Sequence, residues 1–241
     1  MDTIRIERGK TRMIAHRGLS GIETENSYAA FVAAANRNYY GIETDVHVTA
    51  DGRYAIYHDD STGRVCDADY SVEGSLFEKL RALSMREAGT EKFSSVQRIP
   101  ELGEYLRVLR RYDKVGIVEL KNPMEKGHIA AIAEVCAREY DLRKIVFISF
   151  CYENLAVLRA LLPAQKLQYL VGDKRTDESL LQDLSRYSLD LDIAYPLLTR
   201  PLLERLHGAG IEVNCWTCDD PVAAERLVGW GVDMLTTNIL Q

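Results

Sequence analysis

The chain lacks an uninterrupted apolar run of about 20 residues, the length that a helix needs to cross a membrane. Residues 1–8 also lack the apolar stretch of a secretory signal. Lysine and arginine are not clustered, and the formal net charge is −6. Because surfaces that bind nucleic acid are typically basic, this charge excludes a general nucleic-acid binder. We therefore expect neither stable membrane insertion, nor secretion, nor a nucleic-acid partner.

Cysteine is scarce, with five residues in a chain of 241. An odd number of cysteines in a chain long enough to build its own core is typical of free thiols in a reducing compartment, which favours a cytoplasmic protein. Cys215 and Cys218 match the C-x-x-C redox pattern. They fall on a predicted strand, where residues three apart face opposite sides, so we interpret them as small packing residues.

Apolar strand-like runs alternate with segments of helical period from end to end, which indicates an α/β fold with a parallel sheet. Strands are predicted at 12–16, 41–48, 116–121, 145–149, 167–171, 190–195, 211–216 and 233–236. Helices are predicted near 27–38, 101–112, 126–140, 152–161, 177–187, 200–208 and 220–229. Eight parallel strands in a chain close to about 250 residues predict a (β/α)₈ TIM barrel. We expect residues 1–241 to form this single domain.

The second predicted strand is followed by an Asp51-Gly52 pair, which is a strong hairpin signal between alternating apolar residues. Residues 54–58 are therefore predicted to return antiparallel to that strand. The simplest turn pairs Ala50 with Arg53.

This pairing places Asp45 opposite His58 and Glu43 one pair further on. Because strand side chains alternate between faces, all three residues are predicted to project from the same face. Two carboxylates and an imidazole in one small volume are costly unless a cation or an anionic substrate is bound there. The segment therefore predicts a metal-assisted hydrolytic site.

Further reactive side chains fall at the ends of predicted strands. His16 and Arg17 end the first strand, and Glu119 and Lys121 end the strand after the hairpin. Active sites of TIM barrels lie at the carboxyl ends of the strands. We therefore expect these four residues to meet the hairpin residues at one mouth of the barrel.

The side chains at this mouth suit the hydrolysis of a phosphodiester. Glu43, Asp45 and Glu119 offer three hard oxygen ligands, which suit Mg²⁺ or Ca²⁺ better than a soft transition metal. Arg17 and Lys121 bring positive charge for the non-bridging phosphate oxygens. The two histidines titrate near neutrality and can exchange the roles of base and acid.

Short motifs occur in a fixed order along nearly the whole chain: His16-Arg17-Gly18, Glu25-Asn26-Ser27, Glu43-Thr44-Asp45, His58-Asp59, Ile99-Pro100-Glu101-Leu102, Glu119-Leu120-Lys121, Ser149-Phe150, Val213-Asn214-Cys215-Trp216-Thr217, Gly231-Val232-Asp233 and Thr237-Asn238. This ordered set resembles the glycerophosphodiester phosphodiesterase family. The resemblance implies metal-dependent hydrolysis of a glycerophosphodiester to sn-glycerol 3-phosphate and an alcohol.

The resemblance also implies a role for each matching residue. The catalytic pair would be His16 and His58, and the divalent cation would be held by Glu43, Asp45 and Glu119. Phosphate would be bound by Arg17 and Lys121, with Trp216 lining the pocket against the glycerol moiety. The sequence departs from the family pattern at His47, Cys218 and Asp219, which leaves the substrate preference open.

Residues 60–98 form the one long irregular interval, and connections of this length are usually lids or binding loops. Leu76, Leu80 and Leu83, with Phe77, indicate one short helix inside it. The interval resembles a small form of the insertion that family members carry over the mouth, and we expect it to act as a lid that selects the alcohol.

Plainer interpretations exist for single residues. A strand-end histidine is often only a hydrogen-bonded structural residue, and Glu119 with Lys121 alone could be a surface pair. Trp216 could be barrel packing, and His47 is interpreted as structural. The clustering of two histidines with three acids favours a site over these alternatives.

Three other functions compete with the hydrolase hypothesis. A zinc amidohydrolase would have His-x-His on the first strand, where His16-Arg17 stands here. A related phospholipid phosphodiesterase would need apolar or basic docking loops, and a non-catalytic phosphoester-binding barrel has no need for both histidines. The identity of the alcohol, the choice between Mg²⁺ and Ca²⁺, the attacking nucleophile and the oligomeric state stay open.

Overall fold

A computed structural model describes residues 2–173 and 178–241, and eight parallel strands of this part close into a barrel. The strands are β1 (Arg12–Ala15), β2 (Gly41–Val48), β4 (Val115–Leu120), β5 (Ile145–Ser149), β6 (Lys166–Val171), β7 (Asp190–Ala194), β8 (Val213–Trp216) and β9 (Met234–Thr237). The ring closes because β1 pairs in parallel with both β2 and β9. The predicted TIM barrel is therefore confirmed, with strand ends displaced by no more than a few residues.

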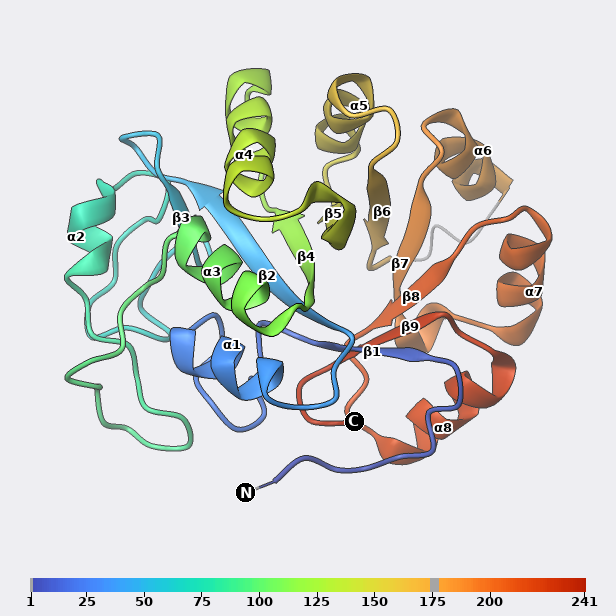
Figure 1. The fold of residues 1–241 in the computed structure, drawn as a ribbon, viewed down its shortest axis with the longest axis horizontal. Helices are drawn as coiled ribbons and strands as arrows, with labels where there is room; N and C mark the ends of the chain where they lie inside the picture. Colours follow the sequence, from blue (N-terminus) through green and yellow to red (C-terminus); the bar gives the residue numbers. More distant parts are fainter. Residues whose placement is uncertain (1, 174–177) are drawn as a thin grey trace.

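Helices surround the barrel on its outside (Figure 1). They are α1 (Tyr28–Ala35), α3 (Leu102–Tyr112), α4 (Lys126–Glu139), α5 (Tyr152–Leu161), α6 (Glu178–Arg186), α7 (Arg200–Gly208) and α8 (Pro221–Trp230), with 3-10 turns η1 (Leu142–Lys144) and η2 (Tyr195–Leu197). Each predicted helix is present, although residue 177 of the predicted 177–187 helix lies outside the described residues. Local signals set several starts; Ser27, for example, accepts a hydrogen bond from the Ala30 amide and caps α1.

Two apolar layers support the barrel. Inside the ring pack Ile14, Ile117, Val146, Ile148, Leu170 and Met234. A larger cluster fills the space between the strands and the surrounding helices, so strands buried on both faces read as nearly continuous apolar runs. None of the helices in residues 2–173 and 178–241 has both the length and the apolar character needed to span a membrane.

The hairpin after β2 is present, but its predicted register is wrong by one residue. Strand β3 (Tyr54–Ile56) pairs antiparallel with β2, with Val48 opposite Tyr54 and Val46 opposite Ile56. Continuing this pairing places Asp45 beside Tyr57, and the Tyr57 amide does donate to the Asp45 carbonyl at 3.2 Å.

The error arises from the turn, which spans three residues and not two. The Thr49 amide donates to the Arg53 carbonyl at 2.9 Å, and Gly52 adopts a left-handed φ of 74° that suits the last position of a three-residue loop. Asp51 accepts from the Thr49 hydroxyl at 2.6 Å and from the Phe77 amide at 3.0 Å. A contact with a distant segment therefore fixes the turn.

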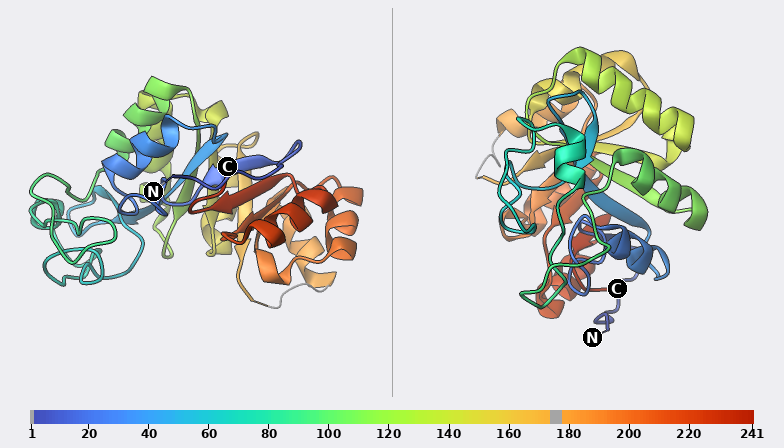
Figure 2. Two further views of the ribbon diagram at one scale, coloured as in Figure 1. Left: turned by 90° about the horizontal axis from the view of Figure 1, so that it is seen from below. Right: turned by 90° about the vertical axis from the view of Figure 1, so that its left-hand side faces the viewer.

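Residues 60–98 build a lobe of mostly irregular chain beside the barrel (Figure 2). The predicted short helix is present as α2 (Phe77–Arg81). The lobe packs around its own apolar cluster, to which β3 and the following residue contribute Ala55 and Tyr57. Hydrogen bonds tie it to the loops at the carboxyl ends of the strands, as when the Thr24 hydroxyl donates to the Arg86 carbonyl at 2.5 Å. The insertion thus lies against the loops at the mouth.

Candidate active site

Three carboxylates meet at the carboxyl ends of two adjacent strands. Glu43 and Asp45 lie on β2, and Asp45 pairs in register with Glu119 on β4. All three are buried, and one oxygen of each lies within 4.8 Å of the others. Among the residues that the structure describes, a search for three or more acids, histidines or cysteines whose ligand atoms are spaced for a metal ion finds these three carboxylates.

The protonation of these acids reflects their crowding. Burial and the neighbouring carboxylates raise the pKa of Glu43 well above its ordinary value, and burial with Asp45 raises the pKa of Glu119 to about 8. Burial also acts to raise the pKa of Asp45, but Lys121 and Arg17 outweigh it and hold that pKa below its ordinary value. Without a bound cation, some of the three carboxyl groups are therefore protonated, so the cluster carries fewer than three negative charges.

The donor set fits a hard divalent cation. Asp45 Oδ1 is buried and accepts no hydrogen bond from the described residues, although Lys121 Nζ lies 3.3 Å away. Asp45 Oδ2, in contrast, accepts from Asn26 Nδ2 at 2.7 Å, which fixes the plane of the carboxylate. This oxygen has no hydrogen-bond donor and lies next to two further carboxyl groups whose pKa values are raised. Carboxylate oxygens are the ligands that Mg²⁺ and Ca²⁺ prefer.

Arg17 and Lys121 bring positive charge to the same place. Lys121 Nζ lies 3.0 Å from Glu119 Oε1, while Arg17 Nη1 lies 2.9 Å from Glu25 Oε1 and Nε lies 3.6 Å from Asp45 Oδ2. These contacts hold both cations beside the carboxylates, as the sequence predicted.

The turn that carries Arg17 is backbone-strained. Arg17 has a left-handed φ of 52°, and its amide donates to Glu43 Oε2 at 2.7 Å. Gly18 follows with φ 75°, and a Cβ there would lie 2.7 Å from the Ala30 backbone. This conformation directs the residues after β1 toward the mouth of the barrel. At position 18 of the turn only glycine fits.

The two histidines present defined tautomers. His16 Nδ1 lies 2.8 Å from Asn238 Oδ1, whose amide is oriented by Nδ2 donating to Asp219 at 2.6 Å. His16 therefore carries its proton on Nδ1, and Nε2 stays as the basic nitrogen. Burial, with the charge of Arg17, lowers the pKa of His16 to about 4.

His58 reaches the mouth by a route that the predicted register did not describe. Strand β3 ends at Ile56, and the chain then turns so that His58 lines one cavity with His16, Glu43 and Glu119. Its Nδ1 lies 2.6 Å from Asp59 Oδ1, and its carbonyl oxygen lies 3.3 Å from His47 Nε2. Burial lowers the pKa of His58 as well, against the opposing charge of Asp45.

The cavity between these groups is small, about 50 Å³. It is lined by His16, Arg17, Glu43, His58, Glu119, Ile148, Phe150, Leu170, Asp192, Trp216 and Thr236. One wall is apolar, and the rings of Phe150 and Trp216 meet edge to face at 5.6 Å. Trp216 is held there by its Nε1, which donates to the Asp192 carbonyl at 3.2 Å.

Sequence reasoning missed Asp192. It is buried, Oδ1 has no hydrogen-bond partner among the described residues, and burial followed by the charge of Glu119 raises its pKa well above the ordinary value. A signal was available: Asp190 and Asp192 alternate with Leu191 and Ile193, so one face of this strand had to bury acids.

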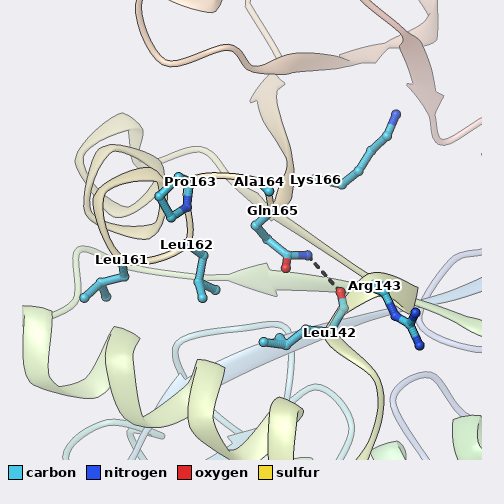
Figure 3. A pocket seen from close by; sticks show the side chains of 8 residues that line it. All are labelled: Leu142, Arg143, Leu161, Leu162, Pro163, Ala164, Gln165 and Lys166. Atoms are coloured by element: carbon cyan, nitrogen blue, oxygen red, sulfur yellow. Dashed lines mark hydrogen bonds between the residues drawn. The ribbon is translucent and has the colours of Figure 1, made fainter.

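The remaining candidates have structural surroundings. His47 is buried between Glu73 and the His58 backbone. Cys215 and Cys218 are buried free thiols whose pKa values burial raises, consistent with packing residues. A second hollow of about 400 Å³ lies at the amino-terminal ends of β5 and β6, around the Gln165 amide that donates to the Leu142 carbonyl (Figure 3). Its lining includes no carboxylate or histidine.

A family model and several named relatives match this chain. A model of the "Glycerophosphoryl diester phosphodiesterase family" matches residues 16–240. A glycerophosphodiester phosphodiesterase of Caldanaerobacter subterraneus subsp. tengcongensis is 30% identical over 95% of this chain and 94% of its own length. One from Bacillus altitudinis is 26% identical over 95% of this chain and 94% of its own.

Solved structures agree. A phosphodiesterase from Oleispira antarctica, in complex with the product sn-glycerol-3-phosphate, is 27% identical, with a TM-score of 0.85 over 94% of this chain and 92% of that one. A structure from Silicibacter pomeroyi, 23% identical, superposes with a TM-score of 0.88 over 98% of this chain and 92% of that one, which shows the shared fold.

Proposed function

Because the chain belongs to the glycerophosphoryl diester phosphodiesterase family, we propose that it hydrolyses a glycerophosphodiester to sn-glycerol 3-phosphate and an alcohol with a divalent cation and two histidines. The family match confirms the resemblance and the enzyme class predicted from the ordered motifs. The observation that carries the specific proposal is the mouth itself, where two histidines with fixed tautomers share one cavity with Glu43 and Glu119.

Glu43, Asp45 and Glu119 are the residues that would hold the cation. When bound, such an ion neutralises a phosphoryl oxygen and orients the diester. The protein itself contributes Arg17 and Lys121, whose side chains lie beside the same carboxylates and can bind the other non-bridging oxygens.

The neighbours of the two histidines differ, and this difference assigns their roles. His16 Nδ1 faces the neutral amide of Asn238, which gives an imidazolium no charge stabilisation. His58 Nδ1 faces the Asp59 carboxylate, which does stabilise one, and a bound phosphodiester anion adds to that effect. In our proposal His16 takes the proton of the attacking hydroxyl or water, and His58 protonates the leaving alkoxide.

The apolar wall explains how the glycerol moiety is placed. Phe150 and Trp216 form a rigid edge-to-face pair, with Leu170 beside them in the lining. Carbon atoms of a small polyol can pack on such a surface while its phosphate faces the charged side. We propose Trp216 as the residue that contacts glycerol.

The direct test of the proposed function is turnover by the purified protein. A panel of glycerophosphodiesters carrying choline, ethanolamine, inositol or glycerol is assayed with Mg²⁺, with Ca²⁺ and with chelator, and sn-glycerol 3-phosphate is measured. We expect metal-dependent release of this product. Failure to release it from every member of the panel with either ion contradicts the proposal.

Cation binding is expected to tighten as the pH rises. Without an ion, the pKa of Glu119 is about 8, so this carboxyl is protonated at neutral pH and must release its proton when an ion binds. Raising the pH removes that proton beforehand, and we expect the Kd to fall by up to about tenfold per pH unit below pH 8 for each proton released. Titration calorimetry in two buffers of different ionisation enthalpy measures both the Kd and the proton release. A Kd independent of pH, without proton release, contradicts this assignment.

The insertion is expected to select the alcohol. Its exposed residues 88–91 form a tip beyond Arg86, whose carbonyl is bonded to Thr24 in the loop after β1. Replacing the tip by a glycine-serine segment of equal length should change the relative kcat/KM among the diesters while leaving cation affinity unchanged, because loops at a barrel mouth contact the substrate. An unchanged ranking of the panel would count against a selecting role.

A further inference from the structure

Arg64 lies in the insertion, outside the cavity, and binds two carboxylates from different segments. Its Nε donates to Asp59 Oδ2 at 2.5 Å. Its two terminal nitrogens donate hydrogen bonds to Glu25, from Nη1 to Oε2 at 2.8 Å and from Nη2 to Oε1 at 2.7 Å. A guanidinium presents its donors in one rigid plane, so these three bonds fix the two carboxylates relative to each other.

Each carboxylate holds a residue of the proposed machinery. Asp59 Oδ1 accepts from His58 Nδ1 at 2.6 Å, and Glu25 Oε1 accepts from Arg17 Nη1 at 2.9 Å. A continuous chain of bonds therefore runs from His58 through Arg64 to Arg17. It joins a group proposed to transfer a proton and a group proposed to bind phosphate.

We propose that Arg64 is a positioning residue that sets the orientation of His58 and of Arg17 at once, a role that rests on the proposed function. Arg64 does not line the cavity, and its side chain is 49% exposed. A bidentate arginine–carboxylate pair within a network of charges can stabilise a fold, so the experiments below include readouts that a purely structural role would not change.

The charges along the chain agree with this role. Burial acts to raise the pKa of Asp59 and of Glu25, but hydrogen bonds from Arg64 outweigh it and lower both. Both groups are therefore carboxylates, which can accept from His58 and Arg17 at the same time as from Arg64.

The first experiment compares Arg64→Ala with Arg143→Ala, an exposed arginine just before the amino-terminal end of β5 whose guanidinium binds the Asp141 carboxylate. We expect Arg64→Ala to lower kcat/KM by about 10- to 100-fold, the usual effect of displacing groups that support a site. The kcat should fall because His58 is misoriented, and KM should rise because Arg17 is. A mere loss of folded protein would lower kcat and leave KM unchanged, and Arg143→Ala should resemble the parent.

Two further variants identify the route of the effect. In an Asp59→Asn background, where the link to His58 is already cut, Arg64→Ala should lower kcat far less than it does in the parent. Arg64→Lys keeps the charge but cannot span both carboxylates, so we expect it to lose at least about fivefold in kcat/KM. This conservative variant decides the question if Arg64→Ala does not fold.

A spectroscopic readout separates this inference from the proposed function, because it needs no turnover. Long-range ¹H–¹⁵N spectra report which ring nitrogen of His58 carries the proton. The parent should show His58 with its proton on Nδ1, and Arg64→Ala should shift it toward the Nε2 tautomer. The inference is overturned by an unchanged His58 tautomer, by a kcat/KM within twofold of the parent in Arg64→Ala or in Arg64→Lys, or by an equal loss in the Asp59→Asn background.

Discussion

Replacing His16 or His58 by alanine should lower kcat at least about 10²-fold, because each substitution removes a group that we propose to transfer a proton on one side of the phosphate. The two rings come from the residue after β1 and from the segment after β3, so they approach the cavity from different directions. One of them could serve both the entering and the leaving oxygen only by moving between them. Steady-state kinetics with saturating cation measures the loss.

The double variant provides the sharper measurement. Residues that act as a unit are not additive, so His16→Ala with His58→Ala should lose far less than the product of the single losses. His128→Ala is the matched control, since His128 is half-buried on α4, does not line the cavity, and packs against Tyr54. A kcat near that of the parent in either single variant would refute the two-histidine mechanism for this protein.

Removing the cation, or a carboxylate that would hold it, should have the other large effect. We expect chelator, Glu43→Gln and Glu119→Gln each to lower kcat/KM by at least about 10³-fold, because a bound cation contributes several kcal/mol of charge stabilisation to the transition state. Asp45→Asn should do the same and should also free Lys121 and Arg17 from their shared anionic partner.

Adding the cation back after chelation distinguishes loss of the cation from unfolding of the protein. Activity lost to chelator should return when Mg²⁺ or Ca²⁺ is added in excess, while activity lost in Glu43→Gln should not. Glu134→Gln, an exposed acid on α4, should behave as the parent. Full activity in chelator after dialysis would exclude the cation from the reaction.

Much of the fold could be predicted because a (β/α)₈ barrel requires little more than buried strands and amphipathic helices that alternate along the chain. Strands such as β4 and β5 are buried on both faces and therefore appear as apolar runs, while the helices between them carry one apolar stripe. Since every strand of a parallel barrel ends at the same rim, the positions of His16 and Glu119 followed from strand ends alone.

The remainder depended on contacts between distant segments. The hairpin register depends on the bond between Asp51 and the Phe77 amide, 26 residues away, and Asp-Gly by itself fits loops of two or three residues. Arg64 meets Glu25 across 39 residues, so no local pattern announces that pairing. Asp192 did have a local pattern, but its polar face was not recognised as the inward one.

Strand β2 pairs both within the barrel and with the strand that leads into the lobe. Residues 41–46 pair with β4 inside the ring, whereas Val46, His47 and Val48 pair with β3 and so with the lobe that residues 60–98 build around a separate apolar cluster. The carboxylates are thus anchored by the barrel, and His58 by a segment whose neighbour Tyr57 packs in the lobe. A substitution in the lobe can therefore alter the setting of His58 while it leaves the three clustered carboxylates on the barrel unchanged.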